Sequence, residues 1–183
     1  MMRKILFLDR DGIVNVDTHF VSKIDEIIFV EGIFELCKYF QEQQFEIVII
    51  TNQSGISRKL FTELDFHSIM KFIIKEFRER NIPVLAYFYC PHNSDDQCTC
   101  RKPLPGLFTK AIQEFDVLAD NCISIGDRER DISAALAAGV TKNYLLHDQQ
   151  ISQGQFPACI VVNSLKEIVK IHRGLLLKAQ NQS

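Results

Sequence analysis

Short apolar segments alternate with longer segments of helical spacing along the whole chain. The apolar segments are rich in Ile, Val and Phe and occupy residues 4–8, 45–50, 84–89, 122–126 and 158–162. Uninterrupted runs of this length are typical of strands that are buried on both faces. Apolar positions at helical spacing fill residues 32–43, 62–80, 105–115, 130–138 and 165–178, and they predict five helices.

Strands that alternate with helices favour an α/β fold with a mostly parallel sheet. We expect a single Rossmann-like domain of three layers over residues 1–183, because the chain is long enough for one core and contains no linker. Two helix ends carry their own signals. Thr62 and Asp65 resemble a capping box, and Gly139 follows a run of alanines as a helix stop.

The charge balance narrows the choice of partners. Lys and Arg total 21 against 23 Asp and Glu, so a net charge of -2 gives no general attraction to nucleic acid or to a membrane. The apolar run after the basic N-terminus is shorter than the ~7 residues of a signal peptide. We therefore expect a cytoplasmic monomer that binds anions through a local cluster of cations.

Polar residues follow the predicted strands, at the edge where open parallel sheets bind ligands. These residues are Asp9 and Asp11, Thr51 and Asn52, the segment 90–102 that ends in Arg101 and Lys102, and Asp127 with Arg128.

The segment Asp9-Arg10-Asp11-Gly12 admits three interpretations. A solvated turn is the most common use of such residues. A calcium loop of the EF-hand type requires an acid or amide at its fifth position, Gly at its sixth and Glu at its twelfth, where this chain has Ile13, Val14 and Phe20. The third interpretation is chemical, and the polar residues after the other strands favour it.

Two carboxylates, a hydroxyl and a lysine meet the needs of phosphoryl transfer, in which charge on the phosphoryl oxygens must be neutralised. The order D-x-D, Thr, Lys and G-D-x-x-x-D resembles the haloacid dehalogenase superfamily. By that resemblance Asp9 is the nucleophile that forms an aspartyl phosphate, and Asp11 is the general acid and base. Thr51 and Lys102 would hold the phosphoryl group, with Asn52 and Arg128 as further phosphate-binding residues.

The same resemblance implies a catalytic Mg²⁺. Its ligands would be the Asp9 carboxylate, the backbone carbonyl of Asp11 and Asp127. Asp131 lies one helical turn after Asp127, where it would either bond to Lys102 or the metal's water shell, or serve as an ordinary acid at a helix start.

The cysteines divide into two groups. Cys37, Cys122 and Cys159 lie singly in apolar surroundings, where we expect buried thiols. The other group has the pattern C-x-H-x5-C-x-C, formed by Cys90, His92, Cys98 and Cys100. Three thiols and an imidazole suit a structural, tetrahedral Zn²⁺ with no open position. We expect this zinc loop, residues 90–100, to place Arg101 and Lys102 in the pocket.

Zinc loops of this kind resemble two groups within the superfamily, the D-glycero-D-manno-heptose 1,7-bisphosphate 7-phosphatases and the histidinol-phosphate phosphatases. The segments Asn15-Val16-Asp17 and Thr51-Asn52-Gln53-Ser54-Gly55 favour the heptose group, whereas the short gap between His92 and Cys98 is as in the histidinol group. A zinc-stabilised, non-catalytic phosphate-binding domain is the alternative outside the enzymes.

The heptose interpretation implies a small phosphorylated sugar as substrate, and such a bisphosphate has a second, non-reacting phosphate. Arg58, Lys59 and Arg101 are candidates for holding it. We expect no large cap domain, because none fits between Asp17 and Thr51 or between Asn52 and the zinc loop.

Overall fold

The computed structural model describes residues 2–147 and 158–180. Its strands are β1 (Lys4–Leu8), β2 (Phe45–Asn52), β3 (Val84–Cys90), β4 (Cys122–Gly126), β5 (Lys142–Leu146) and β6 (Ile160–Val162). Its helices are α1 (Ile33–Glu42), α2 (Glu63–Glu79), α3 (Gly106–Glu114), α4 (Glu129–Ala137) and α5 (Leu165–Gln180), with short 3-10 helices η1 (Ile24–Glu26) and η2 (Ala119–Asn121). All five predicted helices and five of the six strands follow from the sequence pattern.

The six strands form one parallel sheet in the order β3-β2-β1-β4-β5-β6. The chain builds outward from β1 to β3 and then crosses to the other side of β1 to add β4. Leu8, the last residue of β1, pairs with Ile49 of β2 and with Ile125 of β4. The carboxyl ends of these three strands therefore meet at the switch in strand order, which is where such sheets bind ligands.

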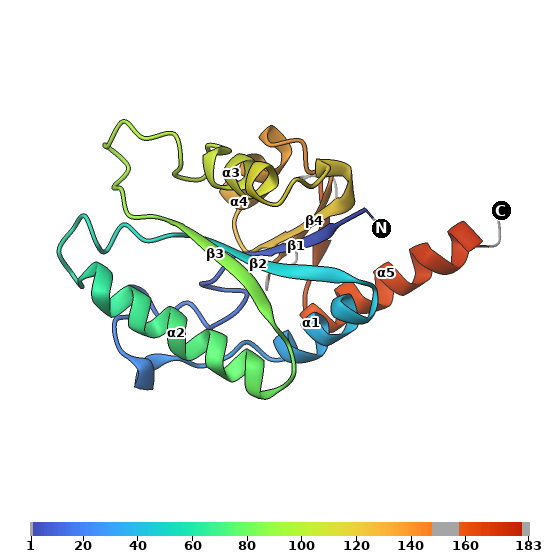
Figure 1. The fold of residues 1–183 in the computed structure, drawn as a ribbon, viewed down its shortest axis with the longest axis horizontal. Helices are drawn as coiled ribbons and strands as arrows, with labels where there is room; N and C mark the ends of the chain where they lie inside the picture. Colours follow the sequence, from blue (N-terminus) through green and yellow to red (C-terminus); the bar gives the residue numbers. More distant parts are fainter. Residues whose placement is uncertain (1, 148–157, 181–183) are drawn as a thin grey trace.

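Helices cover both faces of the sheet (Figure 1). Helices α3 and α4 lie on one face, and α1, α2 and α5 lie on the other. Strand β1 contributes side chains to both cores, because successive side chains of a strand point to opposite faces. Leu6 and Leu8 join the core under α1, α2 and α5, whereas Ile5 and Phe7 join the core under α3 and α4. The predicted three-layer architecture is confirmed.

Strand β5 is the element that the apolar pattern does not predict. Its sequence KNYLL is short, and Asn143 interrupts the apolar run. The structure buries this polar side chain: Asn143 Nδ2 donates to the carbonyl oxygen of Val140 at 2.8 Å, whereas its Oδ1 has no hydrogen-bond partner among the described residues. A buried amide with a partner of its own is tolerated in a strand.

The local helix signals have the expected structures. Thr62 caps α2 and forms a capping box with Asp65, and Gly139 has a φ of 90° directly after α4. Between β1 and α1 the only regular helix is η1, and between β2 and β3 it is α2. No cap domain is inserted within residues 2–147. Within the described ranges, no helix combines the length and apolar character that crossing a membrane requires.

Candidate active site

Three carboxylates converge where β1 and β4 end. Asp9 follows β1, Asp127 follows β4, and Asp131 belongs to the first turn of α4. One oxygen from each lies within 4.8 Å of the others. Glycines permit this approach, because a Cβ on Gly12 would lie 2.5 Å from Asp127 Cγ, and one on Gly126 would lie 2.4 Å from Asp131 Cβ.

Lys102 faces this cluster and neutralises part of its charge. Its Nζ lies 2.8 Å from Asp9 Oδ1 and 2.6 Å from Asp131 Oδ1, and it donates to the carbonyl oxygen of Ile50 at 3.0 Å. Only 2% of the side chain is exposed. The Asn52 amide holds the Lys102 backbone through two hydrogen bonds of 3.0 Å. Asn52 thus positions Lys102, and its own contact with phosphate stays a prediction.

Asp131 is more central than the sequence indicates. It forms the ion pair with Lys102, and its Oδ2 also accepts a hydrogen bond from the backbone N–H of Arg128 at 3.0 Å. Both interpretations of this residue therefore hold at once, since it is a helix-start acid and a partner of the lysine.

The cluster carries an excess of negative charge. Burial and the nearby carboxylate of Asp131 raise the pKa of Asp9 well above its ordinary value, although Lys102 opposes the shift. Burial and Asp131 likewise raise the pKa of Asp127 to about 6. Burial would lower the pKa of Lys102, but Asp131 and Asp9 outweigh it and leave the pKa raised. Lys102 and Arg128, which contacts Asp127, only partly offset the charge of the three carboxylates.

These side chains fit a divalent cation. Asp127 Oδ1 is buried and has no hydrogen-bond partner among the described residues, and carboxylate oxygens are the ligands that Mg²⁺ prefers. A cation among Asp9, Asp127 and Asp131 would satisfy that oxygen and relieve the repulsion. The Asp11 side chain lies outside this group, so any contribution from Asp11 would come from its backbone carbonyl, as the superfamily resemblance implies.

Replacing Asp127 with asparagine is expected to stabilise the magnesium-free protein, and more so at high pH. Folding raises the pKa of Asp127 from 3.8 to about 6. Below about pH 4 this carboxyl is protonated in both states and costs no stability, whereas the unfavourable ionised form destabilises the folded protein as the pH rises through about 6. The gain in unfolding free energy, measured by urea denaturation, should grow from near zero at about pH 4 to on the order of 2 kcal/mol at about pH 8. A gain that does not change with pH would contradict this electrostatic description.

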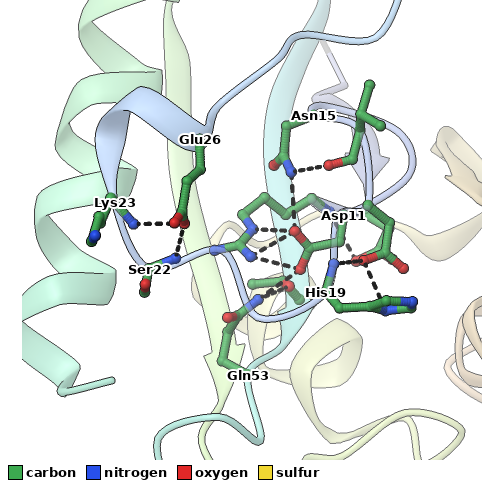
Figure 2. Close-up of polar contacts among 12 residues, drawn as sticks. Asp11, Asn15, His19, Ser22, Lys23, Glu26 and Gln53 are labelled. Carbon is green, nitrogen blue, oxygen red and sulfur yellow. Dashed lines mark hydrogen bonds and ion pairs between the residues drawn. The ribbon is translucent and has the colours of Figure 1, made fainter. Parts of the chain in front are cut away.

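Asp11 and Thr51, both predicted site residues, meet through a third side chain. Gln53 Nε2 donates to Asp11 Oδ2 at 3.0 Å and to Thr51 Oγ1 at 2.8 Å (Figure 2). The Arg10 guanidinium also contacts the Asp11 carboxylate. Sequence reasoning assigned no role to Arg10 or Gln53. The available signals were a cation between two strand-end aspartates and an amide two residues after the strand-end threonine.

A cavity of about 390 Å³ opens beside Asp11, and every predicted arginine lines it. Its wall includes Arg10, Asp17, His19, Phe20, Asn52, Ser54, Arg58, Arg101, Arg128 and Arg130. Arg58 donates to Asn93 Oδ1 and lies over the ring of Phe20. Arg128 contacts Asp127 at 3.1 Å. Although the chain is close to neutral, five arginines line this cavity, as an anionic ligand requires.

The predicted zinc ligands come together. Cys90 Sγ lies 3.8 Å from Cys98 Sγ and 3.5 Å from His92 Nδ1, and His92 Nδ1 lies 3.3 Å from Cys100 Sγ. A tetrahedron with Zn–S bonds of about 2.3 Å has edges of about 3.8 Å, whereas a disulfide requires about 2.05 Å. The spacing of these atoms fits a tetrahedral metal ion and excludes a disulfide in this arrangement.

The zinc loop is connected by hydrogen bonds to residues that line the arginine-lined cavity. Arg101 Nη1 donates to the His92 carbonyl oxygen at 3.1 Å, and the Gln53 backbone N–H donates to the Cys90 carbonyl oxygen at 2.7 Å. The position of the cysteine cluster thus fixes that of Arg101 and, through the next residue, Lys102. The remaining cysteines, Cys37, Cys122 and Cys159, are buried, as the sequence predicts.

The fold and the site define a hydrolase of a known class. Residues 4–139 match the haloacid dehalogenase-like hydrolase family, and the chain belongs to this family.

The similar proteins have names that give a more specific activity than the family description does. The chain is 41% identical over 156 residues, 85% of its length and 89% of the relative's, to a D-glycero-alpha-D-manno-heptose-1,7-bisphosphate 7-phosphatase of Campylobacter jejuni. It is 36% identical, over 90% of its length and 93% of the relative's, to a D-glycero-beta-D-manno-heptose-1,7-bisphosphate 7-phosphatase of Yersinia pestis. A crystal structure of the D,D-heptose 1,7-bisphosphate phosphatase from B. bronchiseptica, complexed with magnesium and phosphate, superposes with a TM-score of 0.82 at 32% identity and covers 96% of this chain and 99% of that one.

Proposed function

We propose that this protein hydrolyses the 7-phosphate of D-glycero-D-manno-heptose 1,7-bisphosphate. The observation that carries the proposal is the convergence of Asp9, Lys102 and two further carboxylates at the end of β1, beside a cavity lined by arginines. The names of the similar enzymes support the choice of substrate. A bisphosphate also explains why cations gather away from Asp9 as well as next to it.

The reaction has two steps. A carboxylate oxygen of Asp9 attacks phosphorus, and the bond from phosphorus to the sugar oxygen breaks. The sugar oxygen keeps the electron pair of that bond and accepts a proton from Asp11. The products of this step are the free sugar hydroxyl and an aspartyl phosphate on Asp9. A water molecule then gives a proton to Asp11 and attacks phosphorus. The bond to Asp9 breaks, which releases inorganic phosphate and restores the carboxylate.

The surrounding residues stabilise the charge of the phosphoryl group. Lys102 lies against Asp9 and would contact one phosphoryl oxygen when phosphorus bonds to Asp9, and the Thr51 hydroxyl would donate to another. Mg²⁺, held by Asp9, Asp127 and the Asp11 carbonyl, would neutralise further phosphoryl charge. Zn²⁺, held by Cys90, His92, Cys98 and Cys100, would keep the loop that carries Lys102 in place.

Replacing Arg58 with alanine is expected to weaken binding of the bisphosphate selectively. Arg58 lines the cavity, whose wall does not include Asp9, Asp127 or Asp131, so it is suited to the phosphate that does not react. One charge-assisted contact corresponds to roughly a tenfold change in affinity. KM for the bisphosphate should rise by about tenfold, whereas KM for a heptose 7-monophosphate should stay nearly constant. An equal rise for both substrates would remove Arg58 from the second phosphate site.

The proposed function is tested by comparing substrates in Mg²⁺. Phosphate release should be fastest from the alpha or beta anomer of heptose 1,7-bisphosphate, and the product should retain the phosphate at position 1. Histidinol phosphate is the matched alternative, because the similarly short zinc loop of that group makes it the competing substrate. Faster release from histidinol phosphate, or no release from any substrate, would refute the proposal.

A further inference from the structure

The carboxylate of Asp11 is held by three neighbouring side chains (Figure 2). Arg10 Nη2 donates to Asp11 Oδ1 at 2.6 Å and to Oδ2 at 2.7 Å, and Arg10 Nε donates to Oδ1 at 3.0 Å. Asn15 Nδ2 adds a bond to Oδ1 at 3.1 Å, and Gln53 Nε2 adds one to Oδ2 at 3.0 Å. Asn15 and Gln53 approach Asp11 from two different sides.

Arg10 is itself fixed in place. Only 1% of its surface is exposed, its guanidinium lies 5.9 Å from the ring centre of Phe66, and its Nη1 has no hydrogen-bond partner among the described residues. A buried cation requires an anion nearby, and within the described ranges Asp11 is the carboxylate with which it forms an ion pair. Moving the guanidinium away from Asp11 would separate a buried cation from this partner. Arg10 thus serves as a rigid support for Asp11.

Gln53 connects two functional residues. Its side chain is buried, with 3% exposed, and its amide nitrogen contacts both Asp11 and Thr51. An amide nitrogen carries two hydrogens, so each contact has a hydrogen of its own. Because Gln53 donates to Thr51 Oγ1, the hydroxyl hydrogen of Thr51 stays available for an anionic oxygen.

We propose that Arg10 and Gln53 are positioning residues that orient the Asp11 carboxylate toward the leaving oxygen and fix its position relative to the Thr51 hydroxyl. This inference rests on the proposed function. About 25% of the Asp11 side chain is exposed, and its carboxylate is oriented by the hydrogen bonds from Arg10, Asn15 and Gln53. Proton transfer requires hydrogen-bond distance to the leaving oxygen, and a displacement of about 1 Å costs about 100-fold in rate.

The test uses the dependence of rate on the leaving group. A sugar alkoxide leaves poorly without a proton, whereas p-nitrophenolate leaves well without one. In single-turnover rapid-quench measurements of leaving-group release, R10K should slow the reaction of heptose bisphosphate by about 100-fold and that of p-nitrophenyl phosphate by less than about threefold. R10K keeps the charge but loses the planar fork that holds both oxygens. D11N should show the same selectivity.

A second variant and a control keep the test independent of folding. Q53M, which preserves volume and adds no charge, should give a selective loss of about tenfold for the sugar phosphate. R80K is the matched control, because Arg80 also combines a carboxylate partner, Glu76, with an aromatic ring, that of Phe34. It should leave both rates unchanged.

The outcomes separate the two proposals. Equal losses with both substrates in R10K and Q53M would overturn the positioning role while leaving the phosphatase function intact. An unaltered protein that releases neither leaving group would overturn the proposed function, and this inference with it.

Discussion

Replacing Asp9 with asparagine is expected to reduce phosphate release by about four orders of magnitude or more, as the loss of a nucleophile does in other enzymes with covalent intermediates. The amide is nearly the same size as the carboxylate but does not attack phosphorus. Lys102 keeps its ion pair with Asp131 at 2.6 Å, so the local structure should survive. Steady-state phosphate release under Mg²⁺ measures the effect.

The D9N variant should lose activity without losing stability. Burial and the neighbouring carboxylates raise the pKa of Asp9, which means that the ionised side chain is unfavourable in the magnesium-free fold. D9N should therefore unfold at the same or a higher urea concentration than the unaltered protein. D65N is the converse control: Thr62 lowers the pKa of Asp65 at the start of α2, so this variant should lose some stability and keep its activity. A D9N protein with more than about 1% of the original activity would exclude Asp9 as the nucleophile.

Replacing Cys98 with serine is expected to cost several kcal/mol of stability and most of the activity. Structural zinc sites contribute of the order of 10 kcal/mol in small domains, and a zinc ion held by this cluster would anchor the segment that carries Arg101 and Lys102. Burial raises the pKa of the Cys90 and Cys100 thiols. Without a metal ion these thiols stay protonated, and no metal–sulfur bonds hold the cluster together. Metal analysis, thermal unfolding and phosphate release measure the three effects.

The buried thiol of Cys37 provides the matched control. Cys37 lies in the core on α1, away from the metal cluster, so C37A should cost only about 1 kcal/mol, retain zinc and keep its activity. Removing zinc from the unaltered protein and restoring only Mg²⁺ should reproduce the loss seen in C98S. Full activity in a zinc-free sample would show that the loop holds Lys102 without the metal.

The sequence predicts most of this fold because its signals are local. Buried strands such as 4–8 and 122–126 are uninterrupted apolar runs, and the capping box of Thr62 and Asp65 marks the start of α2. Strand β5 is not predicted, because Asn143 interrupts its apolar run and is buried with its Nδ2 bonded to the carbonyl oxygen of Val140 in the preceding turn. A contact of this kind depends on the folded backbone and leaves no periodic pattern in the sequence.

The residues of the site also divide into those whose place the sequence predicts and those whose contacts it does not predict. Asp9, Asp127 and Lys102 stand directly after strands or beside the zinc motif, so topology alone brings them together. Asp131 lies one helical turn after Asp127, and this spacing already allowed its contact with Lys102. The contributions of Arg10 and Gln53 depend on side-chain direction. Arg10 turns inward to its own neighbour Asp11, and Gln53 spans from Asp11 to Thr51. Spacing along the chain does not encode these contacts.

The central claim is that Asp9 carries the phosphoryl group during the reaction. Rapid acid quench of the protein during turnover of heptose bisphosphate, followed by peptide mass spectrometry, tests this claim directly. The mechanism predicts one phosphoryl group on the peptide that contains Asp9, which disappears as substrate is exhausted and is absent in D9N. Turnover without this adduct, or with phosphate on another residue, would contradict it.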